Sequence, residues 1–266
     1  MSARVLVTGA GSGIGRAVCL RVARDAAARG EAAHIAAVDV ATSPGLAGVV
    51  DELKKLGAQA VPVHADMGTA DGPAAAVTEA VRALGGLDGL VSNAGVNRPG
   101  ALKDYTVADW DLLFAVNVRA TWLLAKAAHD ALAAARGAIV VTASMSGSNA
   151  HANLGAYAPS KAAVIMLMKV LAQEFGRDGV RVNAVSPGMV RTGMTEPVYR
   201  NTQIATERAQ LVPLGRVATP EDIADAIAWL LSADARYVNG HDLVVDGGVT
   251  GNFLGRLPGL GQIPRG

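Results

Sequence analysis

Tyr157 and Lys161 are the residues of this sequence whose types and spacing most clearly suggest proton chemistry. Residues four positions apart share one face of a helix, and Pro159 between them suits the first turn of that helix. Tyr157 should then lie near the positive end of the helix dipole, which favours a phenolate. The Lys161 ammonium is expected to lower the pKa of Tyr157 from its ordinary value of about 10. A tyrosine of this kind could exchange a proton with an alcohol or a carbonyl oxygen.

A serine upstream of this pair could take part in the same chemistry. Residues 138–142 are a short apolar run typical of a buried strand, and Ser144 follows it. Parallel sheets bind their ligands at the carboxyl ends of the strands, so the Ser144 hydroxyl could hydrogen-bond a substrate oxygen beside Tyr157. Neither signal is specific alone, because exposed tyrosine–lysine pairs and turn-capping serines are common.

The segment from Thr8 to Gly15 is rich in glycine and stands between an expected strand and an expected helix. Glycines let the backbone approach a pyrophosphate, and free N–H groups at the start of the helix can donate to it. The spacing is G-x-x-x-G-x-G from Gly9, with Gly11 as an extra glycine, and differs from the common G-x-G-x-x-G. An ordinary tight turn is the alternative, but the strand before and the helix after favour a nucleotide site.

Asp39 ends the second expected strand and bears on the choice of nucleotide. An acid at this place can accept hydrogen bonds from the adenosine ribose hydroxyls, and it would repel a 2′-phosphate. Ser12, not a basic residue, precedes Gly13, and no Lys or Arg closely follows Asp39. These features favour NAD over NADP, with a solvated strand-end aspartate as the alternative.

The elements that must position these residues alternate between strand and helix along the chain. Strands are predicted at 4–8, 34–39, 60–64, 89–92, 138–142, 181–186 and 242–245, and helices near 14–29, 46–57, 70–84, 107–134, 155–176 and 220–232. This alternation predicts the α/β class, as a single-domain (1–266), Rossmann-like, doubly wound parallel sheet of about seven strands with helices on both faces. Residues 189–213 are predicted to form a substrate lid, and 249–266 a C-terminal tail.

Composition limits the classes of function. The chain is 51% hydrophobic and 18% charged with a formal net charge of +1, and it has no basic run, which argues against nucleic-acid binding. Charges interrupt every long apolar stretch, so no membrane span is expected. The single cysteine, Cys19, favours a reducing compartment, and we expect a soluble, cytoplasmic protein. The histidines lack metal-ligand spacing, so no catalytic metal is predicted.

Taken jointly, the motifs resemble the short-chain dehydrogenase/reductase family in its NAD-preferring Tyr-x-x-x-Lys type. The resemblance covers residues 3 to about 248 and rests on motifs in the family's order: Thr8-Gly-x-x-x-Gly-x-Gly15, Asn93-Ala94-Gly95, Asn117, Ser144, Tyr157-x-x-x-Lys161, Pro187-Gly188, Leu214-Gly215-Arg216 and Asp246-Gly247-Gly248. It implies that Tyr157 is the general acid/base and that Lys161 lowers its pKa and holds the nicotinamide ribose. It also implies that Ser144 polarises the substrate carbonyl and that Asn117 holds a water linking Lys161 to solvent.

The resemblance also implies a set of cofactor contacts. Asp66 and Met67 would meet the adenine, and Thr192 would bond the nicotinamide carboxamide. The full cofactor set is Gly9, Ser12, Gly13, Ile14, Gly15, Asp39, Asp66, Met67, Asn93, Ala94, Gly95, Tyr157, Lys161, Pro187, Gly188, Val190 and Thr192. Helices near 107–134 and 155–176 would pair between copies, giving a homotetramer or a homodimer.

The substrate itself is not named by the sequence. Residues that could touch it are Ser144, Ser146, His151, Asn153, Met189 and Met194, although loop polarity and lid packing explain several of them equally well. The leading hypothesis is hydride transfer between NAD(H) and a secondary alcohol or ketone. One alternative is a 3-oxoacyl-[acyl-carrier-protein] reductase, which usually uses NADPH. Another is a non-enzymatic nucleotide-sensing protein, against which the intact Tyr157 and Lys161 argue.

Overall fold

The computed structural model describes residues 3–252. Its centre is a sheet of seven strands in the order β3-β2-β1-β4-β5-β6-β7, with every neighbouring pair parallel. The strands are β1 (Arg4–Thr8), β2 (His34–Asp39), β3 (Gln59–His64), β4 (Gly89–Ser92), β5 (Ala138–Thr142), β6 (Arg181–Pro187) and β7 (Asp242–Val245). The predicted fold class is therefore confirmed.

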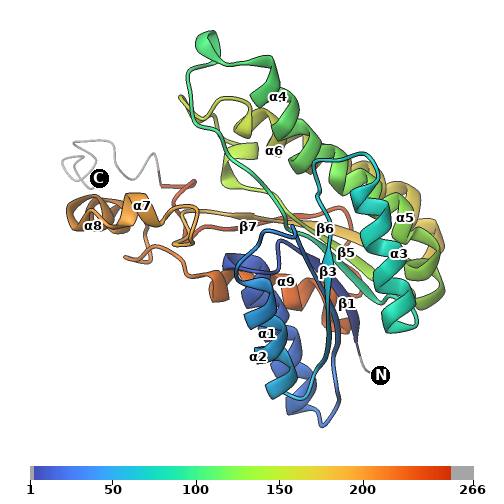
Figure 1. Ribbon diagram of the computed structural model, residues 1–266. Coiled ribbons are helices and arrows are strands. Elements are labelled where there is room, and N and C mark those ends of the chain that lie inside the picture. The colour runs from blue at the N-terminus through green and yellow to red at the C-terminus, as the bar shows by residue number, and fades with distance from the viewer. Residues whose placement is uncertain (1–2, 253–266) are drawn as a thin grey trace, which may run out of the picture.

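Helices cover both faces of the sheet (Figure 1). The larger ones are α1 (Gly13–Ala28), α2 (Leu46–Lys55), α3 (Gly72–Leu84), α4 (Val107–Phe114), α5 (Ala120–Ala135), α6 (Tyr157–Phe175) and α9 (Pro220–Leu231). Helices α1, α2 and α9 share one hydrophobic core with the sheet, and α3, α5 and α6 share a second on the other face. Strands between two cores need apolar side chains in both directions, which explains the continuous apolar runs of the sequence.

The predicted strand boundaries are nearly those of the structure. Every residue of β5 is buried, and the run was recognisable because no polar residue interrupts it. β3 begins one residue earlier than predicted and β6 ends one residue later. β3 is the edge strand of the sheet, and exposed residues alternate with buried ones along it, so its start is less clearly marked.

The helix predicted near 107–134 is divided by a change in winding. Between α4 and α5 the chain makes a π-helical segment (Ala115–Arg119) that contains the buried Asn117. Such wide turns insert one residue into a helix and are frequent at functional sites. The apolar periodicity is similar on both sides, so the sequence predicted one continuous helix.

The segment predicted as a lid, 189–213, contains two helices that sequence analysis did not anticipate, α7 (Glu196–Tyr199) and α8 (Thr202–Leu211). Asn201 begins α8 by accepting hydrogen bonds from the backbone N–H groups of Gln203 and Ile204. Both helices lie at the side of the molecule away from α3 and α5 (Figure 1). Most of the predicted tail, from residue 253 on, lies outside the described residues.

Within residues 3–252, no helix has the length and the apolar character needed to cross a bilayer. Cys19 is completely buried in α1, and burial raises the pKa of its thiol to about 12, so it fills the core and is not a reactive thiolate. The sheet order places β1 beside β4, where the chain direction along the sheet reverses. In parallel α/β sheets, ligands bind at that reversal, beyond the carboxyl ends of the strands.

Candidate active site

A cavity of about 420 Å³ lies at the carboxyl ends of the strands. It brings together all but one of the residues predicted to bind a cofactor: Gly9, Ser12, Gly13, Ile14, Asp39, Asp66, Met67, Asn93, Ala94, Gly95, Tyr157, Lys161, Pro187, Gly188, Val190 and Thr192. Gly15 is absent from the cavity wall. A Cβ on Gly15 would lie 2.1 Å from the Gly9 carbonyl oxygen, so the lack of a side chain allows α1 to pack against the turn.

The glycine-rich turn has the geometry of a phosphate-binding loop. Gly9 and Gly13 have φ angles of 66° and 53°, which a side chain would strain. Ser12 precedes α1 and its side chain makes no capping hydrogen bond. The start of α1, with its free N–H groups and positive dipole end, therefore lines the cavity and can bind a pyrophosphate.

Asp39 is held firmly at the end of β2. One carboxylate oxygen accepts a hydrogen bond from the Gly11 N–H at 2.9 Å, and the other accepts from the Val40 N–H at 2.8 Å. A Cβ on Gly11 would lie 2.7 Å from the same carboxylate. The glycine turn and Asp39 thus depend on one another. The Asp39 carboxylate lines the cavity at the end of β2.

A set of hydrogen bonds joins the ends of β1, β4 and β5. Thr8 Oγ1 accepts from the N–H groups of Asn93 and Ala94 at 2.9 and 3.0 Å. Asn93 Nδ2 donates to the Thr8 carbonyl at 3.0 Å, and Asn93 Oδ1 accepts from Thr142 Oγ1 at 3.2 Å. These contacts fix the floor of the cavity. Asp66 is held similarly, since its Oδ1 accepts from the Gly68 N–H at 2.7 Å.

The catalytic end of the cavity is built on β5 and α6. Tyr157 is the first residue of α6, as predicted from Pro159, and Ser144 follows β5. Ser144 is 8% exposed, hydrogen-bonds Tyr157 and accepts from the Ser146 N–H at 3.1 Å. Both hydroxyls face the same cavity, where they can hold one substrate oxygen between them.

Lys161 lies one helical turn beyond Tyr157 and is 5% exposed. Its Nζ donates to the Thr142 carbonyl at 2.8 Å and lies 5.7 Å from the centroid of the Tyr157 ring. Asn117 does not line the cavity wall. Its side chain accepts from the Val96 N–H at 2.9 Å, and its Nδ2 donates to the Val96 carbonyl and to Ser160 Oγ at 3.1 Å each. Asn117 thereby joins the π-helical segment to α6.

The expected lowering of the Tyr157 pKa is not found, and this corrects the sequence analysis. Burial raises the pKa of the Tyr157 hydroxyl, and its hydrogen bond with Ser144 only partly opposes this. Burial also lowers the pKa of Lys161 to about 8, because the charged ammonium has lost most of its water. Tyr157 is therefore protonated at neutral pH and can act as an acid. Its neighbour Lys161 is expected to lose its proton as the pH rises above about 8.

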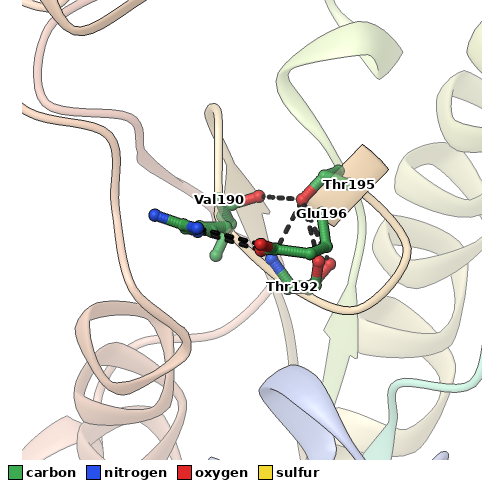
Figure 2. Close-up of polar contacts among 5 residues, drawn as sticks. Val190, Thr192, Thr195 and Glu196 are labelled. Carbon is green, nitrogen blue, oxygen red and sulfur yellow. Dashed lines mark hydrogen bonds and ion pairs between the residues drawn. The ribbon is translucent and has the colours of Figure 1, made fainter. Parts of the chain in front are cut away.

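The lid approaches the cavity through the residues after β6. Val190 pairs with Ala218 in an isolated parallel bridge. The Thr192 side chain would lie 3.6 Å from a Cβ on Gly13. Figure 2 shows Thr195 between Val190 and Thr192, with hydrogen bonds to both.

The residues expected near the substrate divide into those that line the cavity and those that do not. Of that set, Ser144 and Met194 line the cavity, whereas Ser146, His151, Asn153 and Met189 do not. Ser146 is buried and its Oγ lies 2.8 Å from His151 Nδ1. Asn153 has a φ of 64°, and its carbonyl accepts from the Gly100 N–H at 2.9 Å. Asparagine tolerates this left-handed conformation, so the backbone accounts for its presence.

Part of the cavity wall was not predicted from the sequence. The residues it did not name are Val38, Val40, Ala65, Val96, Val116, Thr142, Ala143, Gly193 and Thr195. Most are neighbours of named residues at strand ends and could have been found by extending each motif by one position. Val116 precedes Asn117 and Thr195 follows Met194, and the π-helical segment and the turn after β6 carry them to the cavity.

Comparisons with known proteins decide the family. The family model described as Enoyl-(Acyl carrier protein) reductase matches residues 9–250. The 2-(S)-hydroxypropyl-CoM dehydrogenase 3 of Xanthobacter autotrophicus is 38% identical over 252 residues, which cover 92% of this chain and 96% of the relative. This chain belongs to the short-chain dehydrogenase/reductase family. It is an NAD(P)-dependent oxidoreductase that acts on a CH–OH group.

Other members of the family agree with this assignment. The human (3R)-3-hydroxyacyl-CoA dehydrogenase is 36% identical over 261 residues, covering 93% of this oxidoreductase and 95% of the relative. A short-chain dehydrogenase from Burkholderia cenocepacia, solved with NADP, has a TM-score of 0.84 at 33% identity and covers 93% of this chain and 98% of its own. The glycine cradle, the uncapped start of α1 and the strand-end wall fit a nicotinamide dinucleotide.

Proposed function

We propose that the enzyme transfers a hydride between NAD(H) and a secondary alcohol or its ketone, with Tyr157 as general acid/base. The observation that carries the proposal is that Tyr157, Ser144 and Lys161 line the same cavity as the glycine turn and Asp39. The bound nicotinamide dinucleotide supplies the hydride acceptor or donor. The residues of the chain supply orientation and proton transfer.

The catalytic residues divide the work in the following way. Tyr157 and Ser144 hydrogen-bond the substrate oxygen, and Tyr157 gives it a proton during ketone reduction. Burial raises the pKa of Tyr157, which keeps this proton in place at neutral pH. During alcohol oxidation Tyr157 must accept a proton, so this direction should become faster as pH rises. Lys161 holds the ribose of the cofactor, and Asn117 holds the water that returns protons to solvent.

Asp39 supports NAD as the preferred cofactor. Both of its oxygens accept backbone hydrogen bonds, so the carboxylate cannot easily turn away from a 2′-phosphate. A phosphate there would meet a fixed negative charge without a basic partner among the residues that line the cavity at this end. The NADP in the related Burkholderia structure means that family membership alone does not decide this preference.

The test is a panel of secondary alcohols and ketones assayed with NAD(H) and NADP(H), for the wild type and for Tyr157→Phe. We expect turnover with NAD(H) and a loss of about 10³-fold in Tyr157→Phe, since acid/base catalysis contributes on the order of 10²–10⁴. Binding of NADH, followed by its fluorescence, should persist in the variant. Retained turnover in Tyr157→Phe would overturn the mechanism, and a clear preference for NADPH would overturn the role of Asp39.

Reduction of a 3-oxoacyl thioester is the second candidate. The family model is described by an acyl-carrier-protein substrate, and two of the relatives named above carry CoA or CoM in their names. Acetoacetyl-CoA added to the same panel separates the two candidates. A specificity constant for the thioester far above that for simple ketones, with either cofactor, would favour this second reading.

We also propose that α5 and α6 pair with a second copy, as a homodimer or as part of a homotetramer. Large apolar side chains are exposed on these helices: Trp122, Met166 and Val170. A further hollow lies between the helices, beside Trp122 and Phe175. Val170→Glu should shift the protein to monomer in analytical ultracentrifugation, and an unchanged oligomer would contradict this interface.

Two further parts of the proposal concern the lid and the compartment. We propose that 189–213 closes over the substrate, since Met194 and Thr192 reach the cavity while α8 contributes no residue to it. Proteolysis within α8 that slows when NADH and substrate are present would support closure.

The buried Cys19 is consistent with a cytoplasmic protein that needs no disulfide.

A further inference from the structure

We propose that Thr195 is a positioning residue for the cofactor, whose hydroxyl makes Thr192 a hydrogen-bond acceptor towards the nicotinamide carboxamide. The inference rests on the proposed function, because it concerns the nicotinamide end of the same cavity. Thr195 was not among the residues predicted from the sequence. Thr195 lines the cavity, and its side chain also contacts the Thr192 N–H and the Val190 carbonyl.

The proton of Thr195 has one clear destination. A threonine hydroxyl has a single hydrogen to donate and two lone pairs that accept. Thr195 Oγ1 lies 2.7 Å from the Val190 carbonyl oxygen and 3.3 Å from the Thr192 carbonyl oxygen. The shorter contact takes the hydrogen. The Thr192 N–H donates to the same oxygen at 2.9 Å, so Thr195 joins the two sides of the turn (Figure 2).

This arrangement favours one direction for the Thr192 hydroxyl. The two threonine hydroxyl oxygens lie 3.4 Å apart, a long contact for a hydrogen bond. Because the hydrogen of Thr195 is engaged by Val190, only Thr192 has a hydroxyl hydrogen left for this contact. Thr192 Oγ1 then presents its lone pairs to the cavity. A primary amide, which carries two N–H donors, fits this acceptor, whereas a carbonyl oxygen would need the Thr192 hydrogen to turn away from Thr195.

Within residues 3–252, no other hydrogen bond to the Val190 carbonyl takes the place of the one from Thr195, although the N–H groups of Thr195 and Glu196 also close the turn on the Thr192 carbonyl. The bridge between Val190 and Ala218 uses the Arg191 N–H and the Met189 carbonyl, and leaves the Val190 carbonyl to Thr195. Val190 is 7% exposed, so water cannot easily take the place of the hydroxyl. Arg191 and Glu196 also close the turn with two contacts of 2.9 Å, but this pair is exposed and contributes little.

The test compares binding of NAD⁺ with binding of its 3-acetylpyridine analogue, in which a methyl group replaces the amide nitrogen. Titration calorimetry measures both affinities without turnover. For the wild type, we expect the analogue to bind about tenfold more weakly, the loss of about one hydrogen bond. Thr195→Val keeps the shape and removes the hydroxyl. It should weaken NAD⁺ binding severalfold and reduce the discrimination to about twofold, whereas Thr195→Ser should restore both.

Two further variants make the result interpretable. Thr78→Val is the matched control, because Thr78 is exposed in α3, outside the lid, and its hydroxyl donates to the Ala74 carbonyl within its own helix. It should leave both affinities unchanged. Thr192→Val removes the acceptor itself and should also abolish the discrimination, which provides an independent test if Thr195→Val does not fold.

The outcomes separate this inference from the proposed function. If the wild type binds and discriminates but Thr195→Val keeps the tenfold ratio, the positioning role is overturned and the proposed function stands. Equal weakening of both ligands in Thr195→Val also overturns it, because a purely structural role would have that effect. Full discrimination in Thr192→Val would do the same. If the wild type binds neither NAD⁺ nor NADP⁺, both the proposed function and this inference fail.

Discussion

The two ends of the cavity are built in different ways. At the dinucleotide end, Gly15 packs directly on the backbone at Gly9, and Thr8 and Asn93 bond each other across β1 and β4. At the lid end, nothing lies within 4 Å of a Cβ on Gly193, and Met194 is 60% exposed. The dinucleotide end therefore depends on close backbone packing, whereas the lid end depends on side chains that can change at little cost to the fold.

Gly15→Ala should have the largest effect on this contrast. Its Cβ would lie 2.1 Å from the Gly9 carbonyl oxygen, and backbone atoms cannot yield as a flexible side chain does. We expect a loss of about 3 kcal/mol in the free energy of unfolding, the upper part of the range for overpacking. The matched change in the lid, Gly193→Ala, should stay within about 0.5 kcal/mol. Denaturant unfolding of both variants measures this, and similar losses would remove the contrast.

Lys161→Met tests how much the burial of a charged ammonium between the two ends of the cavity costs in stability. Below pH 8 the lysine is charged in the folded and the unfolded chain, so the cost of burying the charge is fully present. Between pH 8 and its ordinary pKa of 10.5, only the unfolded chain keeps the proton, and wild-type stability should rise with pH. The lowering of the Lys161 pKa from 10.5 to about 8 corresponds to a cost of roughly 3 kcal/mol in the free energy of unfolding at pH 7. Replacing the lysine removes this cost but also removes its hydrogen bond to the Thr142 carbonyl, which is worth about 1 kcal/mol.

Lys161→Met should therefore be about 2 kcal/mol more stable than the wild type at pH 7, and this advantage should disappear by about pH 10. Unfolding at a series of pH values measures the difference. Lys169→Met, at an exposed lysine of the same helix, is the control. A variant less stable than the wild type at pH 7 would mean that the lysine is not strained by burial.

Asp39→Ser tests the selectivity of the dinucleotide end. Removing the fixed charge should move the ratio of NAD⁺ to NADP⁺ affinity towards NADP⁺ by about tenfold, or about 1.4 kcal/mol. Asp51→Ser, at an exposed aspartate of α2, should leave the ratio unchanged. Competition binding with both dinucleotides gives the result. An unchanged ratio in Asp39→Ser would show that preference lies elsewhere.

Met194→Ala should have the smallest effect on stability and sharpens the description of the lid end. Because the side chain is exposed at the cavity mouth, the midpoint of thermal unfolding should not change measurably. The KM for an apolar substrate should rise severalfold, which corresponds to about 1 kcal/mol or less of lost contact. Val107→Ala, at an exposed position of α4, serves as the comparison. A destabilised Met194→Ala would mean that the lid is packed as firmly as the dinucleotide end.

The same contrast explains which parts of the molecule could be predicted. The strands were recognisable because each is a continuous apolar run between two cores, and β5 matches its prediction at both ends. The glycine turn and the spacing of Tyr157 and Lys161 are local patterns that report local geometry. Helix α8 was not predicted, because none of its residues is buried and its sequence therefore carries little periodicity.

Neighbours in sequence to the catalytic residues need not line their cavity. His151 and Asn153 stand between Ser144 and Tyr157 in the chain, yet neither lines the cavity. His151 instead bonds Ser146, and Asn153 provides a left-handed turn that pairs with Gly100. The position of a loop residue depends on what the loop contacts, and those contacts come from distant parts of the chain.

The sequence by itself determined the family motifs, the seven strands and the tyrosine–lysine pair, because each is encoded by residues close together in the chain. Only the tertiary structure decided the direction of the Tyr157 pKa, the partners of Asn117 and the place of Thr195 in the cavity. Burial raises the Tyr157 pKa through surroundings drawn from several elements. Thr195 bonds Val190 and Thr192 only because the turn after β6 folds back on itself. Such properties depend on dielectric surroundings and contact geometry, which sequence spacing does not contain.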